Sequence, residues 1–319
     1  MTGPSIDATA ALLRDVFPGS ARVGDPTYLR WLYEASPFGP VIQANRTDGA
    51  GLAAHYAVVP VELSVDGAPV SGALSLNTAV SERARGGGVF VTLAEETYAL
   101  ARARGVRVVT GVANANSTPG FERRLGFANH GPLPVSVLVP RPGTTRGVRR
   151  GFVRGPAVQA GIVDCADIVL RPGAAGDLLD GAEPLLAPGA AGLARAWTVD
   201  GLRWRLASPG AAYALHRTDR ALVVSTAERR AGLHVGVILA AFAAEPLDAR
   251  EVGLLVRSVC VAHRAPVALH AGFNDRVRFR GRRLPDRFRP SPLNLITRSL
   301  EGAPVPRPAR FEFLDFDAY

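Results

Sequence analysis

Arg85-Gly-Gly-Gly88-Val-Phe90 stands between two apolar segments, and the fold follows from what lies on either side of it. Residues 74–80 before it are largely apolar and bounded by turn residues, which favours a strand. After it, apolar residues recur at helical spacing from Val89 to Ala101. Residues 106–112 are short and β-branched, as is typical of a buried strand. The stretch therefore predicts the order strand, glycine turn, helix, strand.

Gly86, Gly87 and Gly88 at a helix start suit an anionic ligand. Glycine lets backbone N–H groups approach a phosphate closely, and the helix dipole favours negative charge there. Arg85 can add a charge-assisted contact. We therefore expect a pyrophosphate on this turn, while a plain flexible turn is the alternative that three glycines alone leave open.

Two motifs in this order carry a family resemblance. Arg85-x-x-Gly88-x-Phe90, with Leu93 three residues on, resembles the acyl-CoA pyrophosphate motif of the GNAT superfamily of N-acyltransferases, although Phe90 holds a position that is usually small. Phe121-Glu-Arg-Arg-Leu-Gly-Phe127 resembles the family's Phe-Tyr-x-x-Leu-Gly-Phe segment. The resemblance covers residues 25–135 well and residues 195–319 only faintly.

The resemblance implies an α/β fold in which a mostly antiparallel sheet is flanked by helices. It implies acetyl-CoA or a longer acyl-CoA as co-substrate, with the pantetheine arm between the strands at 74–80 and 106–113. A strand bulge near Ala79 and Val80 would offer an N–H to the oxyanion. The residues expected to contact the co-substrate are Thr78, Ala79, Val80, Arg85, Gly86, Gly87, Gly88, Val89, Phe90, Asn114, Asn116, Ser117 and Phe121.

Proton transfer is the part of the site that the motifs leave open. Family members often have a tyrosine that protonates the leaving thiolate, and this chain has Glu122 there. His55 titrates near working pH and is one candidate base, with a buried, hydrogen-bonded histidine as the alternative. Asn77 could pass a proton through water. Asp315 could face the amine, or belong to an exposed edge strand.

The chain before the glycine turn predicts two helices and an antiparallel meander. A first helix spans residues 5–16, and Asp25 is a plausible N-cap for a second helix that opens at Pro26. Strands are expected at 41–46, 52–59, 61–65 and 69–80, with Pro60 as a break or bulge. Asp-Gly pairs at 48–49 and 66–67 mark the hairpins.

A faint internal repeat indicates two related halves. Leu29-Arg-Trp31 recurs as Leu202-Arg-Trp204, an offset of 173 residues (204 − 31), and Arg46-Thr-Asp48 recurs as Arg217-Thr-Asp219, an offset of 171 (219 − 48). We expect a GNAT-like acyl-CoA-binding domain at 1–145 and a degenerate GNAT-like domain at 155–319. The second half has no counterpart of the glycine motif, so we expect it to have lost the CoA site.

Composition narrows the function classes. The net charge is +9, and two stretches, 141–154 and 276–289, are rich in arginine. A solvated surface explains these stretches as well as a nucleic-acid contact does, and no basic run with interleaved aromatic residues favours nucleic acid. The two cysteines form no metal or disulfide framework, and no apolar run is long enough to span a bilayer. We expect a cytoplasmic monomer or homodimer.

These observations predict an N-acyltransferase that moves an acyl group directly from CoA to a primary amine of a small or mid-sized acceptor. By analogy with tandem GNAT proteins of natural-product pathways, an amino sugar or natural-product intermediate is a candidate acceptor. Two alternatives stay open at this point. One is a CoA-binding sensor or scaffold without turnover, and the other is an aminoacyl-tRNA-dependent transferase.

Overall fold

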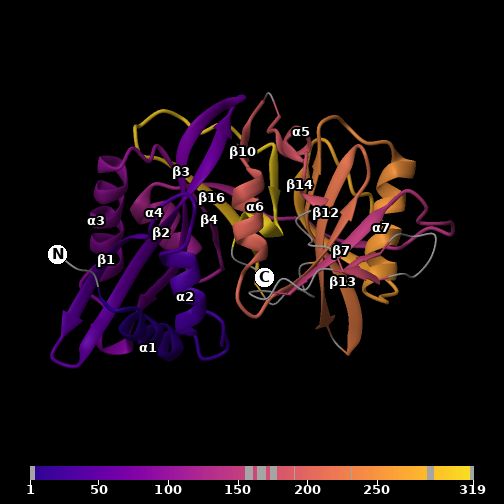
Figure 1. Ribbon diagram of the computed structural model, residues 1–319. Helices are drawn as coiled ribbons and strands as arrows, with labels where there is room; N and C mark the ends of the chain where they lie inside the picture. The colour runs from indigo at the N-terminus through magenta and orange to yellow at the C-terminus, as the bar shows by residue number, and fades with distance from the viewer. Residues whose placement is uncertain are drawn as a thin grey trace. The chain divides into compact units, whose positions relative to one another are not determined.

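The computed structural model describes residues 4–154, 161–163, 170–172, 178–189, 191–230, 232–285 and 291–316. The chain forms two compact units. Unit 1 comprises residues 1–132 and 291–307, and unit 2 comprises residues 133–290 and 308–319. Each unit is therefore built from two separate segments of the chain (Figure 1).

Unit 1 combines four α-helices with a mixed sheet among its described residues. The helices are α1 Ile6–Val16, α2 Pro26–Tyr33, α3 Val89–Ala103 and α4 Thr118–Leu125. The strands are β1 Ile42–Asp48, β2 Gly51–Val65, β3 Ala68–Val80, β4 Val108–Ala113, β5 Ala128–Pro132 and β16 Asn294–Ser299. They follow the spatial order β1-β2-β3-β4-β16-β5, in which only the β3–β4 pair is parallel.

The helices of unit 1 cover both faces of the sheet. Successive strand residues point to opposite faces, and neighbours on β2 show which helix lies where. Tyr56 contacts Tyr98 of α3, whereas His55 contacts Tyr33 of α2. The α3 face buries an apolar core drawn from β1, β2, β3, β4, α3 and α4. The expected N-cap of α2 is confirmed, since Asp25 Oδ1 accepts from Thr27 N at 2.8 Å.

Pro60 does not interrupt its strand, so the predicted break is wrong. β2 runs without interruption from Gly51 to Val65, and Pro60 pairs with Ala73 of β3. The reason lies on the other edge of β2. Its partner β1 begins at Ile42, opposite Val58, so β1 does not reach residue 60 and requires no N–H from it.

Unit 2 is built around a second mixed sheet with the order β15-β6-β14-β13-β12-β11-β7-β8-β9. Its helices are α5 Glu183–Leu186, α6 Val199–Leu206 and α7 Ala249–Ala262. Its strands are β6 Val135–Leu138, β7 Arg149–Arg154, β8 Gly161–Val163, β9 Leu170–Pro172, β10 Leu193–Arg195, β11 Ala212–Arg217, β12 Ala221–Arg230, β13 Leu233–Ala243, β14 Ala268–Asn274, β15 Arg282–Arg283 and β17 Arg310–Glu312.

The two units repeat one succession of elements. In unit 1 it is α2, β1, β2, β3, α3, β4, and in unit 2 it is α6, β11, β12, β13, α7, β14. In both, the helix crosses over between two parallel strands. The short sequence matches fall on equivalent elements, because Trp31 lies on α2 and Trp204 on α6.

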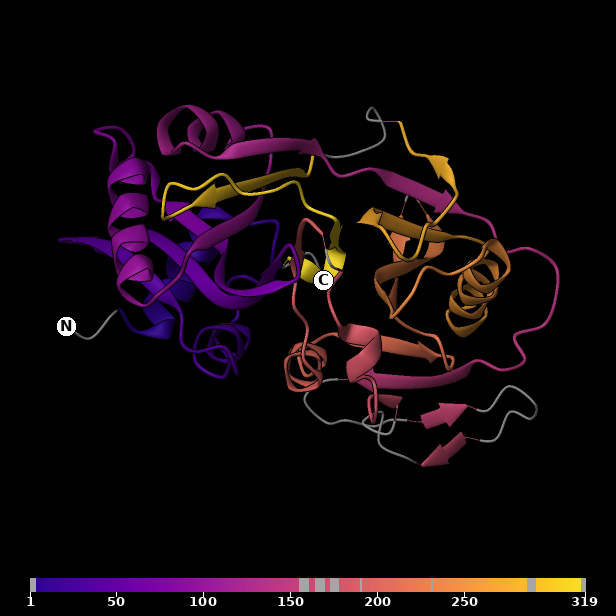
Figure 2. The ribbon, with the colours of Figure 1, turned by 90° about the horizontal axis from the view of Figure 1, so that it is seen from above.

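The halves also exchange one strand each. β16, from the second half of the chain, pairs with β4 and β5 in unit 1. β6, from the first half, pairs with β14 and β15 in unit 2. Figure 2 shows the yellow β16 among purple and magenta strands. The predicted ranges 1–145 and 155–319 are continuous in sequence, whereas the compact units are not.

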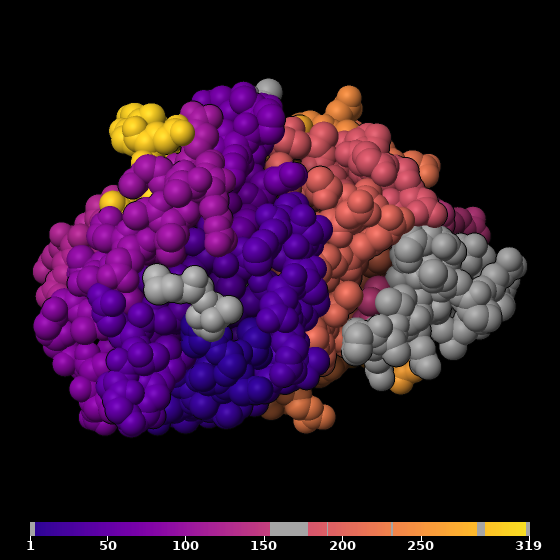
Figure 3. Space-filling model, turned by 60° about the vertical axis from the view of Figure 1, so that its left-hand side comes forward, coloured from indigo at the N-terminus to yellow at the C-terminus, as the bar shows by residue number. Residues whose placement is uncertain are grey.

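The exchanged segment leaves a visible trace on the surface of unit 1. Residues 301–304, which follow β16, are exposed. Figure 3 shows yellow atoms from the C-terminal part of the chain projecting from the surface beside unit 1. Within the described ranges, none of the helices has the length and apolar character needed to cross a bilayer.

Candidate functional site

The glycine turn has a backbone that only glycine adopts readily. Gly86, Gly87 and Gly88 have φ of 94°, 57° and 74°, in the left-handed region. Gly88 is the N-cap of α3, with no side chain to accept from the first helical amides. The first turn of α3 also contains no acidic residue. This helix start is therefore open to an external anion.

Several amides at this turn have no acceptor. The N–H groups of Gly86, Gly87, Gly88 and Phe90 form no hydrogen bond within the part of the chain that the structure describes. All three glycines are exposed, as is the Arg85 side chain. A run of unpaired N–H groups beside a guanidinium is the usual way in which a protein binds phosphate without a metal.

A gap opens between β3 and β4 close to this turn. The two parallel strands pair from Gly72–Val108 to Ser75–Gly111 and no further. Beyond Ser75, Asn77 adopts φ of 52°, and the β2–β3 register shifts between His55 and Ala57. This bulge ends the pairing. The predicted splay of the strands is thus present, and the irregularity lies two to three residues before the predicted Ala79 and Val80.

Backbone groups at the end of β3 point into this gap. Ser81 N donates to Ala53 O at 2.9 Å, so residue 81 bonds towards β2. Alternate residues of an antiparallel strand bond to opposite sides. The N–H and C=O of Val80 therefore point away from β2, on the side where β4 has separated. An extended ligand in the gap would find a donor and an acceptor there.

Two hydroxyl groups beside Val80 lack partners. The Oγ1 of Thr78 and the Oγ of Ser81 are buried, and neither has a hydrogen bond within the described residues. Buried polar atoms are nearly always paired, and leaving one unpaired costs about 1–3 kcal/mol. Orphaned hydroxyls next to an open strand edge are typical of a ligand site.

Phe90 occupies the motif position that is usually small, and the packing explains why a large residue fits. Its ring contacts Tyr56 and Phe121, with ring centroids 5.9 and 5.5 Å apart. Gly120 leaves it room, since a Cβ there would lie 3.2 Å from Phe90 Cε1. Phe121 is itself buried in this cluster. Phe121 therefore belongs to the core, Phe90 is partly buried against it, and the backbone N–H of Phe90 remains available to a ligand.

Residues 1–129 match the family model described as acetyltransferase (GNAT) domain. We call unit 1, which contains these matched residues, the GNAT domain. No curated protein sequence matches the chain.

Three solved structures of similar fold are only 10–13% identical to the chain in sequence, so they establish the fold alone. A GCN5-related N-acetyltransferase from Anabaena variabilis ATCC 29413 matches with a TM-score of 0.59 and 13% identity, over 94% of this chain and 71% of its own. Eis1 from Mycobacterium abscessus gives 0.55 and 12%, over 94% and 73%. A tandem GNAT protein from the clavulanic acid biosynthesis pathway gives 0.54 and 10%, over 94% and 96%. The chain thus has the tandem GNAT-like fold.

His55 is fully buried in the GNAT domain, and both of its ring nitrogens are engaged. Nδ1 lies 2.7 Å from Asn45 Oδ1, and Nε2 lies 3.1 Å from Tyr33 Oη. Burial lowers the pKa of His55 to about 4, so the ring is neutral near pH 7. This environment fits the buried, hydrogen-bonded histidine that sequence analysis gave as the alternative to a base.

The direction of each hydrogen bond in this chain follows from chemistry. The Asn45 oxygen can only accept, so Nδ1 of His55 carries the proton and Nε2 accepts from the Tyr33 hydroxyl. The Tyr33 oxygen in turn accepts from Asn77 Nδ2 at 3.2 Å. The network thus ties the bulge at Asn77 to α2, β1 and β2. Sequence reasoning missed the role of Tyr33, because nothing in the motif spacing links it to residue 77.

Glu122 and Asp315 differ sharply in exposure. Glu122 lies on the solvent-exposed side of α4. Asp315 belongs to unit 2, where it is 4% exposed and accepts from Trp197 Nε1 at 2.9 Å and Glu312 N at 2.7 Å. Burial raises its pKa. The exposed edge strand suggested for it is wrong, since residues 313–315 form a buried 3₁₀ turn. Asp317 lies outside the described residues.

Asn114 and Ser117 bond to each other. Ser117 N donates to Asn114 Oδ1 at 2.9 Å, and Asn114 N donates to Ser117 Oγ at 3.1 Å. These bonds form the turn that leads from β4 into α4. Asn116, between them, is exposed. Of these three residues, which are expected to contact the co-substrate, two thus have their side chains engaged in this turn.

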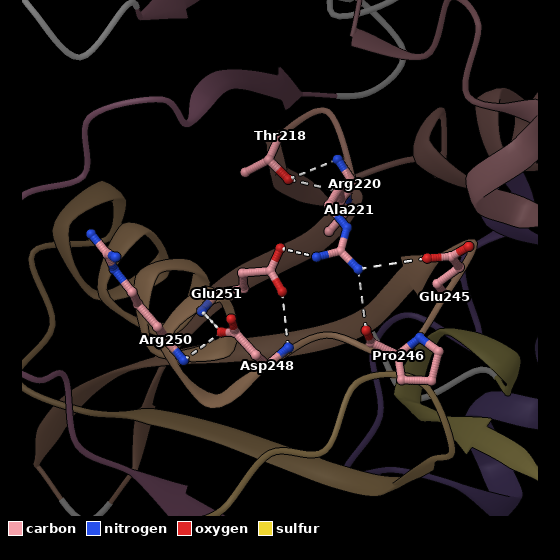
Figure 4. Close-up of polar contacts among 8 residues, drawn as sticks. All are labelled: Thr218, Arg220, Ala221, Glu245, Pro246, Asp248, Arg250 and Glu251. Carbon is pink, nitrogen blue, oxygen red and sulfur yellow. Dashed lines mark hydrogen bonds and ion pairs between the residues drawn. The ribbon is translucent and has the colours of Figure 1, made fainter.

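The helix of unit 2 that corresponds to α3 provides its own anion. Asp248 is the N-cap of α7, and its Oδ1 accepts from Arg250 N and Glu251 N at 2.8 Å each. Glu251 completes the capping box by accepting from Asp248 N, and it also pairs with Arg220 (Figure 4). The amides that α3 leaves open are therefore occupied in α7.

The gap of unit 2 that corresponds to the β3–β4 gap is filled by the chain itself. β13 and β14 pair over only three residues, where β3 and β4 pair over four, and β17 then pairs with β14. Glu312 of β17 is fully buried, and its Oε2 accepts from Ala241 N and Asn274 Nδ2, both at 3.1 Å. Its Oε1 lies 2.9 Å from His270 Nε2. A carboxylate thus takes the backbone donor that an extended ligand would need.

Proposed function

We propose that the chain is an acyl-CoA-dependent N-acyltransferase whose GNAT domain holds the co-substrate. The observation that carries the proposal is the run of unpaired amides at Gly86, Gly87 and Gly88, at the open start of α3. Arg85 adds the charge that a diphosphate requires. The gap beyond Ser75 leads from this turn along β3 and suits an extended arm.

Each group of the site has a role in this proposal. The turn amides and Arg85 would hold the diphosphate, and Val80 would pair with the pantetheine amides through its backbone. Acyl-CoA supplies the acyl group as a thioester, which is activated towards an amine. Thr78 and the N–H groups of the bulge would stabilise the developing oxyanion, since preorganised donors act mainly on the transition state. Positioning of both reactants supplies much of the remaining rate.

No strong base is required if the acceptor amine reaches the site uncharged. His55 is neutral and engaged at both nitrogens, so we assign it a positioning role towards Asn77 rather than proton transfer. A thiol pKa of about 8.5 lets the thiolate leave without an acid in the place of Glu122. The rate should then rise with pH as the acceptor loses its proton. We propose a primary amine on a small or mid-sized molecule as acceptor.

Release of free thiol from acetyl-CoA and longer acyl-CoA, measured against a panel of primary amines including amino sugars, tests this function. Arg85→Ala should lower kcat/KM by about tenfold, because a charge-assisted contact to the diphosphate is lost. Arg104→Ala is the matched control, since Arg104 is an exposed arginine at the other end of α3. We expect it to change kcat/KM by no more than about twofold.

Two results would contradict the proposal. Binding of CoA species without thiol release for any amine would favour the sensor or scaffold. Failure to bind any CoA species would contradict both the transferase and the CoA-binding sensor or scaffold.

A further inference from the structure

Unit 2 contains a pocket of about 480 Å³ beside the first turn of α7. One side is apolar and comes from β6 and α7, including Leu138, Val252 and Val256. The other side carries arginines from two distant segments: Arg141 follows β6, and Arg278 and Arg280 follow β14. The two arginine-rich stretches of the sequence thus meet at one hollow.

The arginines of this pocket have positive charge to offer. Arg141, Arg278 and Arg280 are exposed, and none has a hydrogen bond or ion pair within the described part of the chain. Arg276 is different, because it donates to the carbonyls of Ala187, Pro188 and Ala243 and so holds the fold.

The carboxylates in the lining reduce this charge only in part. They are Asp248 and Asp275. Asp248 already accepts from the first amides of α7 (Figure 4), so the helix end is not the anion site. The guanidinium groups are therefore what the pocket presents to a ligand.

The size and chemistry of the pocket indicate the ligand. Pockets for small molecules measure about 300–1,000 Å³, and this one falls in that range. Guanidinium groups bind phosphate with two parallel hydrogen bonds and stack on flat rings. The apolar side, extended by Val139 at 68% exposed, can cover an apolar or flat body. A concave site of this volume suits a small molecule better than the backbone of a nucleic-acid duplex.

We propose that this pocket binds a phosphorylated small molecule with a flat or apolar body, such as a nucleoside phosphate. The site is distinct from the proposed acyl-CoA site. It cannot accept a pantetheine arm along the sheet, because Glu312 and β17 occupy the gap between β13 and β14. Binding here therefore does not depend on the proposed transferase activity.

Calorimetric titration of the full chain with adenosine 3′,5′-bisphosphate tests the proposal, with inorganic phosphate and a short RNA as further probes. Arg278→Gln/Arg280→Gln should weaken binding of the bisphosphate by at least about tenfold, since charge-assisted hydrogen bonds are lost. Arg141→Gln should also weaken binding of the bisphosphate, because Arg141, from the segment that follows β6, lines the same pocket. Arg282→Gln/Arg283→Gln removes the same charge from exposed neighbours on β15 that lie outside the pocket lining. Arg85→Ala shows whether any of the measured binding comes from the proposed diphosphate site of the GNAT domain.

Loss of affinity in Arg278→Gln/Arg280→Gln, with Arg282→Gln/Arg283→Gln and Arg85→Ala unaffected, would support the site. Equal losses in both double variants would indicate general charge attraction and overturn it. A loss confined to Arg85→Ala would place the signal in the GNAT domain and also overturn it. The same holds if only RNA binds, or if inorganic phosphate binds as tightly as the bisphosphate.

Discussion

Three adjacent glycines give the GNAT domain its open helix start. Their φ values lie in a region that costs other residues about 1–2 kcal/mol, and their N–H groups point to no acceptor in the described chain. At the start of α7 the situation is the opposite, because the Asp248 carboxylate accepts hydrogen bonds from the amides of Arg250 and Glu251. A capping carboxylate is present at the start of α7 and absent at the start of α3, and this difference decides whether the first amides of the helix are occupied or open.

Gly88→Ala tests the backbone of the turn. An added Cβ at Gly88 meets nothing within 4 Å, so its cost comes from φ alone, about 1–2 kcal/mol. Gly105→Ala is the control, with φ of 82° and equally open space beyond α3. Chemical denaturation should show a similar loss of stability in both variants. Only Gly88→Ala should weaken CoA binding, and equal affinities in the two variants would argue against a phosphate site here.

Buried histidines make stability depend on pH. Burial lowers the pKa of His55 and of His263 to about 4 each, and that of His216 well below its usual value. Between pH 6.5 and 4 the unfolded chain binds protons that the folded chain does not, so stability falls as the pH drops through this window. His55→Gln replaces one of these histidines with a side chain that does not titrate, so the chain takes up one proton fewer on unfolding in this pH window.

The slope of unfolding free energy against pH is the measurement for His55→Gln. Between pH 5 and 6 this slope should be about 1 kcal/mol per pH unit smaller than in the wild-type chain. Because the slope is compared, a uniform loss of stability in the variant does not affect the result. An unchanged slope would mean that His55 is protonated in the folded chain.

At the scale of elements, an interrupted strand pair recurs in the two units with different outcomes. In unit 1, β3 and β4 separate beyond Ser75 and leave an edge with unpaired hydroxyls at Thr78 and Ser81. In unit 2, β17 fills the corresponding place, and the Glu312 carboxylate satisfies the donors there. We infer that the same architecture serves as a binding cleft in one unit and as core in the other.

Glu312→Ala should destabilise the protein by about 3 kcal/mol, since it leaves buried donors on Ala241 and Asn274 unpaired. Glu301→Ala, which removes an exposed partner of Arg107, should cost at most about 1 kcal/mol. Denaturant unfolding of both variants provides the comparison. A loss at position 312 no larger than at 301 would show that the carboxylate does not hold the gap closed.

Local signals in the sequence predicted the elements well. Asp25 with Pro26 marked the start of α2, and the glycines at 86–88 and 105 bounded α3, because caps and positive φ depend on neighbouring residues alone. The exchange of β6 and β16 was not predictable in this way. β16 pairs Thr297 with Thr110, a contact between distant parts of the chain that no local pattern encodes.

The candidate site likewise contains residues that the sequence predicted and residues that only the fold brings together. The turn amides and Arg85 follow from the motif, whereas the hydrogen-bonded chain from Asn77 through Tyr33 to His55 joins three separate elements. A lone histidine among apolar residues of a strand predicts a buried partner, and does not say which residue supplies it. The space for the Phe90 ring likewise depends on Gly120, a residue that only the fold brings close to it.

At the scale of the whole molecule, we infer that two units of the same fold have different tasks. The GNAT domain has open amides and an open gap, while unit 2 has capped amides, a filled gap and an arginine-lined pocket. A crystal structure of the chain with CoA tests this assignment most directly. The account predicts diphosphate oxygens within about 3 Å of the amide nitrogens of Gly86–Gly88. A diphosphate bound in unit 2, with the glycine turn of the GNAT domain empty, would contradict it.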